Sequence, residues 1–259
     1  MKIKKRFKVN NVHQFMKKHK FGYTKIKKRG VKDNRDYKKL KYFNFEKKII
    51  KLIDKNQLSL IVKSRQMHFS TLMAAYTFWG LAKRKDVYYI SNSRHLNELF
   101  VEKVRDMINK NKNSSLTINN KRNLSLNNGG SLMTYSFNPE MFYSRDIKNS
   151  IIIIDEAAFI DGLDVILDTI FGRYCPKTTQ VIIGSTPNGY EYFYELYKDS
   201  FNSSSQLKSP KFKSIKVNFQ DNPLQDEEFI NHIYKSMNKS WMSFRQEILG
   251  DFFNYRECE

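Results

Sequence analysis

The sequence has little of what secreted or membrane-anchored proteins need. Only two cysteines occur in 259 residues, Cys175 and Cys258, and they lie too far apart for a disulfide framework or for zinc-ligand spacing. No stretch approaches the roughly 20 apolar residues of a transmembrane helix, and the basic start at residues 1–8 is not followed by an apolar signal-peptide core. We therefore expect a reducing intracellular compartment and no membrane partner.

Acidic residues are also scarce relative to basic ones. The chain has 46 Lys and Arg against 26 Asp and Glu, which gives a net charge of +20. Such an excess predicts a polyanionic partner. A membrane surface would require a basic amphipathic helix with exposed aromatics, and the sequence shows none clearly, so nucleic acid is the expected partner. The alternative is a lysine-rich surface that is merely solvated.

The N-terminal segment concentrates this charge. Residues 1–30 contain twelve Lys and Arg and no acidic residue. We define residues 1–36 as a basic N-terminal arm, which is either a DNA-contacting extension or a solvated, partly ordered tail.

Beyond the arm, the hydrophobic pattern alternates between helices and strands. Short apolar strands are expected at 58–62, 87–90, 151–154 and 180–183. Helical spacing is expected at 37–53, 72–81, 95–108 and 226–253, and Asn127–Gly130 predicts a β-hairpin turn between residues 124 and 135. Continuous Ile and Val strands that alternate with helices indicate an α/β domain with a mainly parallel sheet covered on both faces.

The polar loop after the first strand lies where a phosphate-binding turn is expected. An ordinary P-loop has the pattern G-x-x-x-x-G-K-[ST], whose backbone N–H groups and lysine hold phosphates and whose hydroxyl binds Mg²⁺. Here Lys63 stands at the first glycine, His68 at the second, Phe69 at the lysine and Ser70 at the hydroxyl. By itself, the loop therefore departs from the pattern.

Two adjacent carboxylates follow the all-isoleucine strand at 151–154. Asp155 and Glu156 stand at its carboxyl end, where open α/β sheets place their ligands. Neighbouring residues of a strand point in opposite directions, so one carboxylate can face a metal ion while the other meets an attacking water. The pair therefore indicates a site for phosphoryl chemistry, and the alternative is two solvated acids that happen to end a strand.

Taken together, these motifs resemble the ordered motif set of large terminase ATPases. The resemblance rests on Lys63–Thr71, on Ile151–Ile160, on Ser185–Gly189 followed by aromatics, on the hairpin at 127–131 and on the segment Trp241–Phe252. It covers roughly residues 37–253. It implies a P-loop NTPase domain of the RecA/ASCE-like type, with a mainly parallel sheet flanked by helices and with helical additions at both ends.

The resemblance also assigns roles in the loop and beside it. Many terminases carry the phosphate-binding lysine at the start of a deviant Walker A motif, which is the place of Lys63. Implied nucleotide-binding residues are Lys63, Ser64, Arg65, Gln66, Met67, His68, Phe69, Ser70 and Thr71. His68 replaces the family's usual glycine, and its Cβ disfavours a positive φ.

The remaining roles fall outside the loop. Ser70 and Asp155 would coordinate Mg²⁺, Glu156 would polarise the attacking water, and Arg145 would be the arginine finger. The motif Ser185, Thr186, Pro187, Asn188 and Gly189 would couple γ-phosphate loss to the DNA-gripping part. Phe45 and Glu46 occupy the position where the family often has an aromatic and Gln for adenine, and a core role for Phe45 is the alternative.

The resemblance predicts an ATP-hydrolysing motor that moves double-stranded viral DNA into a procapsid. It further implies a homo-oligomeric ring, a pentamer in this family, on a portal, with a small terminase subunit, in the host cell cytoplasm. Residues 254–259 would begin a linker, and no nuclease activity is expected because no acidic cluster remains unassigned.

Two other functions stay open. One is a helicase-like nucleic-acid translocase, although 259 residues leave no room for a second RecA-like domain. The other is a catalytically weak or inactive, basic DNA-binding or scaffold module of P-loop fold, which His68 favours. Mg²⁺-dependent ATP turnover separates the motor from the inactive module.

Overall fold

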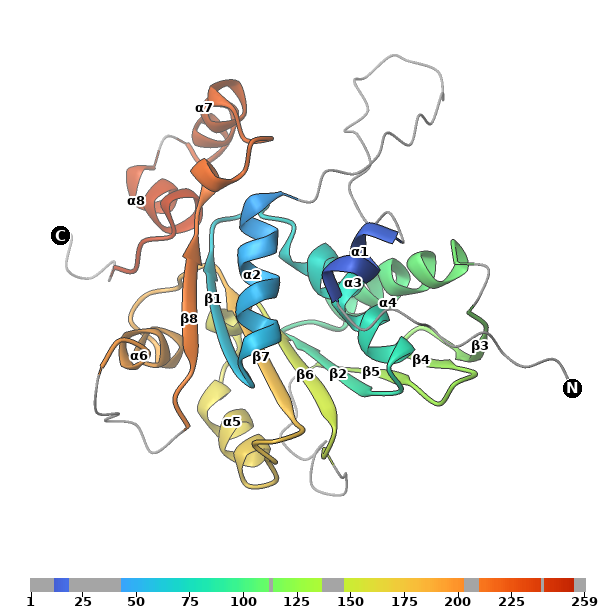
Figure 1. Ribbon diagram of the computed structural model, residues 1–259. Helices are drawn as coiled ribbons and strands as arrows, with labels where there is room; N and C mark the ends of the chain where they lie inside the picture. The colour runs from blue at the N-terminus through green and yellow to red at the C-terminus, as the bar shows by residue number, and fades with distance from the viewer. Residues whose placement is uncertain are drawn as a thin grey trace, which may run out of the picture.

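One sheet with helices on both faces organises the chain (Figure 1). The computed structural model describes residues 12–18, 43–111, 114–136, 147–202, 210–238 and 240–253. Within these residues the sheet has eight strands in the order β3-β4-β5-β2-β6-β7-β1-β8. The strands are β1 Leu58–Lys63, β2 Asp86–Ser91, β3 Leu116–Asn119, β4 Asn123–Leu126, β5 Ser131–Ser136, β6 Ser150–Asp155, β7 Gln180–Ser185 and β8 Lys213–Val217.

Eight α-helices and three short helical turns accompany the described strands. The α-helices are α1 Val12–Lys18, α2 Asn44–Lys55, α3 Phe69–Ala82, α4 Arg94–Asn109, α5 Leu163–Phe171, α6 Tyr192–Asp199, α7 Glu227–Ser236 and α8 Trp241–Phe244. The turns are the 3-10 helices η2 Ala157–Phe159 and η3 Phe219–Asp221 and the π-helical η4 Arg245–Leu249. No helix in the described part of the chain is both long and apolar enough to span a membrane.

The sheet is parallel across six consecutive strands, as the sequence predicts. β5, β2, β6, β7, β1 and β8 pair in parallel, and only β3 and β4 add antiparallel strands at one edge. The expected hairpin is confirmed as β4 and β5, joined by residues 127–130. β7 lies between β1 and β6, so the strand that leads into the loop at 64–68 and the strand that ends in Asp155 are separated by one strand.

Both faces of the central strands β1, β6 and β7 are buried, which explains the unbroken isoleucine run in β6. Ile151 and Ile153 pack with α1, α2, α3 and α4, whereas Ile152 and Ile154 pack with α5 and α6 on the opposite face. Successive side chains of a strand alternate between faces, so a strand covered on both sides needs apolar residues at every position. This layering holds the carboxyl ends of the parallel strands at one edge.

The segment Val12–Lys18 of the basic arm belongs to the core, which the sequence does not predict. Val12, Phe15 and Met16 are buried, and the Phe15 ring meets the Phe78 ring of α3 edge-on at 5.2 Å. These residues are therefore neither a solvated tail nor a free extension. The other residues of the arm lie outside the described residues, and their contact with DNA stays a prediction.

The expectation of continuous helical spacing over residues 226–253 is wrong in part. α7 ends before Asn238, whose φ of 51° is left-handed, and α8 begins anew after Ser240, whose hydroxyl accepts from the Ser243 N–H at 3.3 Å. A left-handed residue ends an α-helix because the next N–H groups turn away from its axis. The helical path continues as η4 and stops at Gly250, so α7 and α8 lie as separate pieces near one end of β8 (Figure 1).

Candidate nucleotide site

The loop between β1 and α3 adopts a glycine-like backbone without glycine. Gln66 and His68 have φ of 59° and 53°, in the left-handed region. Such a conformation costs about 1–2 kcal/mol for residues with a Cβ. Burial and then the nearby Lys103 ammonium lower the pKa of His68, which favours its neutral imidazole. The loop thus adopts the left-handed backbone at His68 although the Cβ of this residue disfavours it.

Lys63 and Glu156 meet across the carboxyl edge of the sheet. Lys63 is the last residue of β1, Glu156 directly follows β6, and the Lys63 Nζ donates to Glu156 Oε1 at 2.7 Å. The Lys63 side chain is 6% exposed and that of Glu156 is 31% exposed. A buried ammonium needs an anionic partner, so the lysine at the start of the loop lies in a position that requires negative charge.

Asp155 is held by three donors. Its Oδ2 accepts from the Ser70 hydroxyl at 2.6 Å and from the Tyr89 hydroxyl at 2.9 Å, and its Oδ1 accepts from the Glu156 N–H at 3.0 Å. Burial first, and then the Asp155 charge, raise the pKa of Tyr89 well above its ordinary value, so its phenol stays a neutral donor. The two predicted metal ligands, Ser70 and Asp155, are thus adjacent.

The motif at 185–189 holds the turn that follows Glu156. The Ser185 hydroxyl accepts from the Ala158 N–H at 3.1 Å, and the Asn188 amide donates to the Ala158 carbonyl at 3.0 Å. Thr186 and Pro187 are buried, and Gly189 has a φ of 70°. The predicted coupling residues therefore contact the backbone of η2, two residues beyond the proposed catalytic carboxylate.

Phe69 packs on β7 at the position where an ordinary P-loop has its lysine. A Cβ at Gly184 would lie 2.4 Å from two carbons of the Phe69 ring, so only glycine admits the ring there. The Lys63 Nζ lies 5.8 Å from the centre of the same ring. The Phe69 side chain therefore fills the space between β7 and Lys63, and a contact of Phe69 with nucleotide stays a prediction.

Residues near the C-terminus cover the outer side of the loop, and no sequence motif predicted this role for them. The Ser64 hydroxyl donates to the Ile248 carbonyl, and the Arg65 guanidinium pairs with Glu247. The Arg65 N–H donates to the Glu247 carbonyl at 2.6 Å. The Gln225 amide donates to the carbonyls of residues 65 and 66 at 3.2 Å each. Because η4 uses the Arg65 N–H, this group is not available to a phosphate.

The contacts described above do not include the remaining predicted residues. Arg145 lies outside the described residues. Phe45 is 1% exposed and stacks on Phe43 at 6.0 Å, and the Glu46 carboxylate accepts from the Phe43 N–H at 2.8 Å at the start of α2. Their contact with adenine stays a prediction. Met67 is buried, and Thr71 lies in the first turn of α3.

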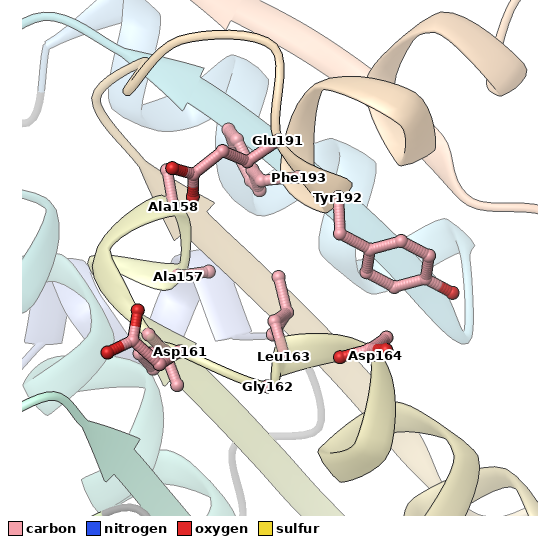
Figure 2. A pocket seen from close by; sticks show the side chains of 10 residues that line it. Ala157, Ala158, Asp161, Gly162, Leu163, Asp164, Glu191, Tyr192 and Phe193 are labelled. Carbon is pink, nitrogen blue, oxygen red and sulfur yellow. The ribbon is translucent and has the colours of Figure 1, made fainter.

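A cavity of about 240 Å³ opens beside η2, between the starts of α5 and α6. Figure 2 shows the carboxylates of Asp161, Asp164 and Glu191 among its lining side chains. The lining contains no Lys or Arg, so a triphosphate would meet like charge there. The loop at 63–71 is therefore the better place for a nucleotide.

The family of the chain follows from its sequence. Residues 60–257, most of the chain, match the family model described as terminase large subunit, T4likevirus-type, N-terminal. The chain therefore belongs to this family. It is a homologue of phage large terminase ATPase domains, the motor of DNA packaging. No curated protein is similar enough in sequence to give a match.

Solved structures agree with this assignment at the level of the fold. The large terminase ATPase domain of Thermus phage P74-26 is 18% identical, with a TM-score of 0.61 over 82% of this chain and 94% of that one. The HK97 bacteriophage large terminase is 14% identical, with a TM-score of 0.64 over 97% of this chain and 56% of that one.

A third structure was solved with nucleotide. The large terminase of a thermophilic bacteriophage, in complex with ADP, is 11% identical, with a TM-score of 0.65 over 82% of this chain and 54% of that one. This chain thus spans about half the length of the two longer terminases it matches.

The fold predicted from the sequence, a P-loop domain of the ASCE type, is confirmed.

The contact between Phe69 and Gly184 generates a compensation test. Gly184→Ala should lower the free energy of unfolding by about 1–3 kcal/mol because the ring must move or the strands must part. In a Phe69→Ala background the same change should cost little, since the clashing ring is gone. Urea unfolding of the four proteins measures both costs. Gly172→Ala is the control, because its Cβ would lie at an ordinary 3.4 Å from its nearest neighbour. Equal costs of Gly184→Ala in the two backgrounds would contradict the packing described here.

Proposed function

We propose that this chain binds and hydrolyses Mg-ATP at the loop 63–71 and uses the reaction to move double-stranded DNA. The observation that carries the proposal is the convergence of Lys63, Glu156, Ser70 and Asp155 at one edge of the sheet, with contacts of 2.7 and 2.6 Å. A cation, a hydroxyl and two carboxylates are the groups that phosphoryl transfer requires. They come from segments far apart in the sequence.

Lys63 is the proposed phosphate ligand. Its buried ammonium needs an anionic partner, and an oxygen of a bound triphosphate is the alternative to the Glu156 carboxylate. The loop N–H groups beyond residue 65, at the start of α3, add donors for the same phosphates. Arg65, which is exposed and pairs with Glu247, is a second candidate cation.

Ser70 and Asp155 fit a magnesium ion. Mg²⁺ prefers hard oxygen ligands and is commonly bound by one or two carboxylates together with substrate phosphates. The Ser70 hydroxyl and the Asp155 Oδ2 lie 2.6 Å apart. Ser70 is in the first turn of α3, and Asp155 ends β6. When bound, the ion would neutralise charge on the phosphate oxygens.

Glu156 is the proposed group that orients and polarises the attacking water. Its carboxylate pairs with Lys63 in this structure, and an ammonium that turns to a phosphate leaves the carboxylate able to accept from water. Exchange of one anionic partner for another thus links substrate binding to the availability of the base.

Three roles follow from the family rather than from described contacts. Arg145 is proposed as the arginine finger, acting within a ring of subunits, a pentamer in this family, mounted on a portal with a small terminase subunit. Residues 185–189 are proposed to transmit loss of the γ-phosphate through the backbone of η2, which Ser185 and Asn188 contact. The host cytoplasm is the proposed location during viral assembly.

ATP turnover tests the catalytic proposal. Glu156→Gln should lower kcat by about 10²–10⁴-fold while ATP still binds, since the variant keeps the shape and loses the base. Lys63→Ala should weaken ATP binding itself. Phosphate release with Mg-ATP, at high protein concentration and with and without DNA, measures the first effect, and equilibrium ATP binding measures the second. Glu191→Gln, an exposed carboxylate of the acidic cavity, is the matched control and should behave as wild type.

Two results would count against the catalytic proposal. Turnover that survives both Glu156→Gln and Lys63→Ala would place the reaction elsewhere. Wild-type protein that neither binds nor hydrolyses ATP would favour the inactive DNA-binding module. ATP binding without turnover would instead indicate a domain whose hydrolysis needs a neighbouring subunit.

DNA binding tests the partner proposal. Because the net charge of +20 favours phosphate contacts, affinity for duplex DNA should fall with salt, with a log–log slope of about −0.9 per phosphate contacted. Two duplexes of unrelated sequence should bind equally, since phosphates carry no sequence information directly. Fluorescence anisotropy across a salt series measures both. A flat salt response would contradict the proposal, and cleavage of the duplexes in the presence of Mg²⁺ would contradict our expectation that this chain has no nuclease activity.

A further inference from the structure

Tyr89 of β2 reaches the proposed metal carboxylate from outside the phosphate-binding loop. β2 pairs with β6 in parallel, with Tyr89 opposite Ile153, and the Tyr89 hydroxyl donates to Asp155 Oδ2 at 2.9 Å. No sequence motif includes this residue, because it lies in an apolar strand 66 positions before its partner.

The Tyr89 side chain is buried and packs against α4. It is 2% exposed, and its ring stacks on Phe100 of α4 with ring centres 3.6 Å apart and planes 9° apart. Asp155 is also 2% exposed. A buried carboxylate needs hydrogen-bond donors that orient it. The Tyr89 hydroxyl is such a donor, and its ring is held between β2 and α4 rather than on a loop.

The two donors to Asp155 Oδ2 differ in kind. Ser70 belongs to α3 just after the loop, and its hydroxyl is itself a proposed metal ligand, so its geometry must serve two partners. Tyr89 has no such second duty in the proposed reaction. Its hydroxyl also hydrogen-bonds with that of Ser70, but its ring belongs to β2, outside the phosphate-binding loop.

We propose that Tyr89 is a positioning residue that orients Asp155 for the divalent metal of the nucleotide site. The inference rests on the proposed function, because it assumes that Asp155 serves a metal that binds together with nucleotide. Loss of the hydroxyl should weaken the metal without weakening the metal-independent part of nucleotide binding.

The neighbouring residue provides a matched control. Tyr88 lies on the same strand, is 3% exposed, and faces the opposite side of the sheet, where it stacks on Tyr135 with ring centres 6.4 Å apart. Tyr88→Phe and Tyr89→Phe therefore remove the same atom from the same strand, on opposite faces of the sheet.

ADP binding, measured with Mg²⁺ and with EDTA, separates the metal effect from folding. For Tyr89→Phe we expect the concentration of MgCl₂ that half-saturates the tightening of ADP binding to rise about 10–100-fold, the usual effect of losing a partner of a metal ligand. In EDTA, Tyr89→Phe should bind ADP as tightly as Tyr88→Phe does. The two variants should also have the same melting temperature. Tyr88→Phe should keep the wild-type response to MgCl₂.

A double-mutant cycle keeps the inference falsifiable if Tyr89→Phe proves less stable. Tyr89→Phe should add no further loss of Mg²⁺ response in an Asp155→Asn background, because Tyr89 acts through that carboxylate. Additive losses, or a wild-type Mg²⁺ response in Tyr89→Phe, would overturn the role of Tyr89 while leaving the ATPase proposal intact. Absence of any ADP binding by the wild-type protein would overturn both.

Discussion

The ion pair between Lys63 and Glu156 is the contact on which the site depends. It joins the end of β1 to the residue after β6, across β7, at 2.7 Å, and it gives a nearly buried ammonium its anionic partner. The Lys63 ammonium is the buried member of the pair and needs an anion beside it, which is Glu156 here and a phosphate oxygen in the proposed nucleotide complex. The parallel sheet brings the two residues together because the neighbouring strands β1, β7 and β6 end at the same edge.

Around this pair, four separate segments fix the geometry. Tyr89 and Ser70 hold Asp155, and Ser185 and Asn188 hold the turn after Glu156. On the outer side, η4 occupies the hydroxyl of Ser64 and the N–H of Arg65. The loop that would receive phosphate is therefore braced both by the sheet and by the segment that precedes the C-terminus. The braced residues directly precede Gln66 and His68, whose backbone is left-handed without glycine.

The parts predictable from the sequence are those whose cause is local. Apolar runs identify the central strands, and Asp155 and Glu156 at the end of such a run identify the edge that carries chemistry. The sequence does not predict β8 because Lys213–Val217 at the sheet edge contains two lysines and a serine and so gives no continuous apolar run. The helical spacing over residues 226–253 was continuous in sequence, but the left-handed Asn238 divides it.

The parts that could not be predicted depend on contacts between distant residues. Tyr89 and Gly184 look like ordinary strand residues. The pairing of β2 with β6 brings Tyr89 to Asp155, and the packing of α3 on the sheet brings Phe69 to Gly184. Likewise, Glu247 lies 182 positions from Arg65. The family resemblance located the motif residues, whereas the residues that support them required the three-dimensional fold.

The most direct test of the central claim is a structure of this chain with Mg²⁺, ADP and beryllium fluoride, which mimics the γ-phosphate. The account predicts that the Lys63 Nζ lies within hydrogen-bonding distance of the beryllium fluoride and no longer contacts Glu156. A structure in which the phosphates are bound while Lys63 remains paired with Glu156, and another cation such as Arg65 takes its place, would contradict it.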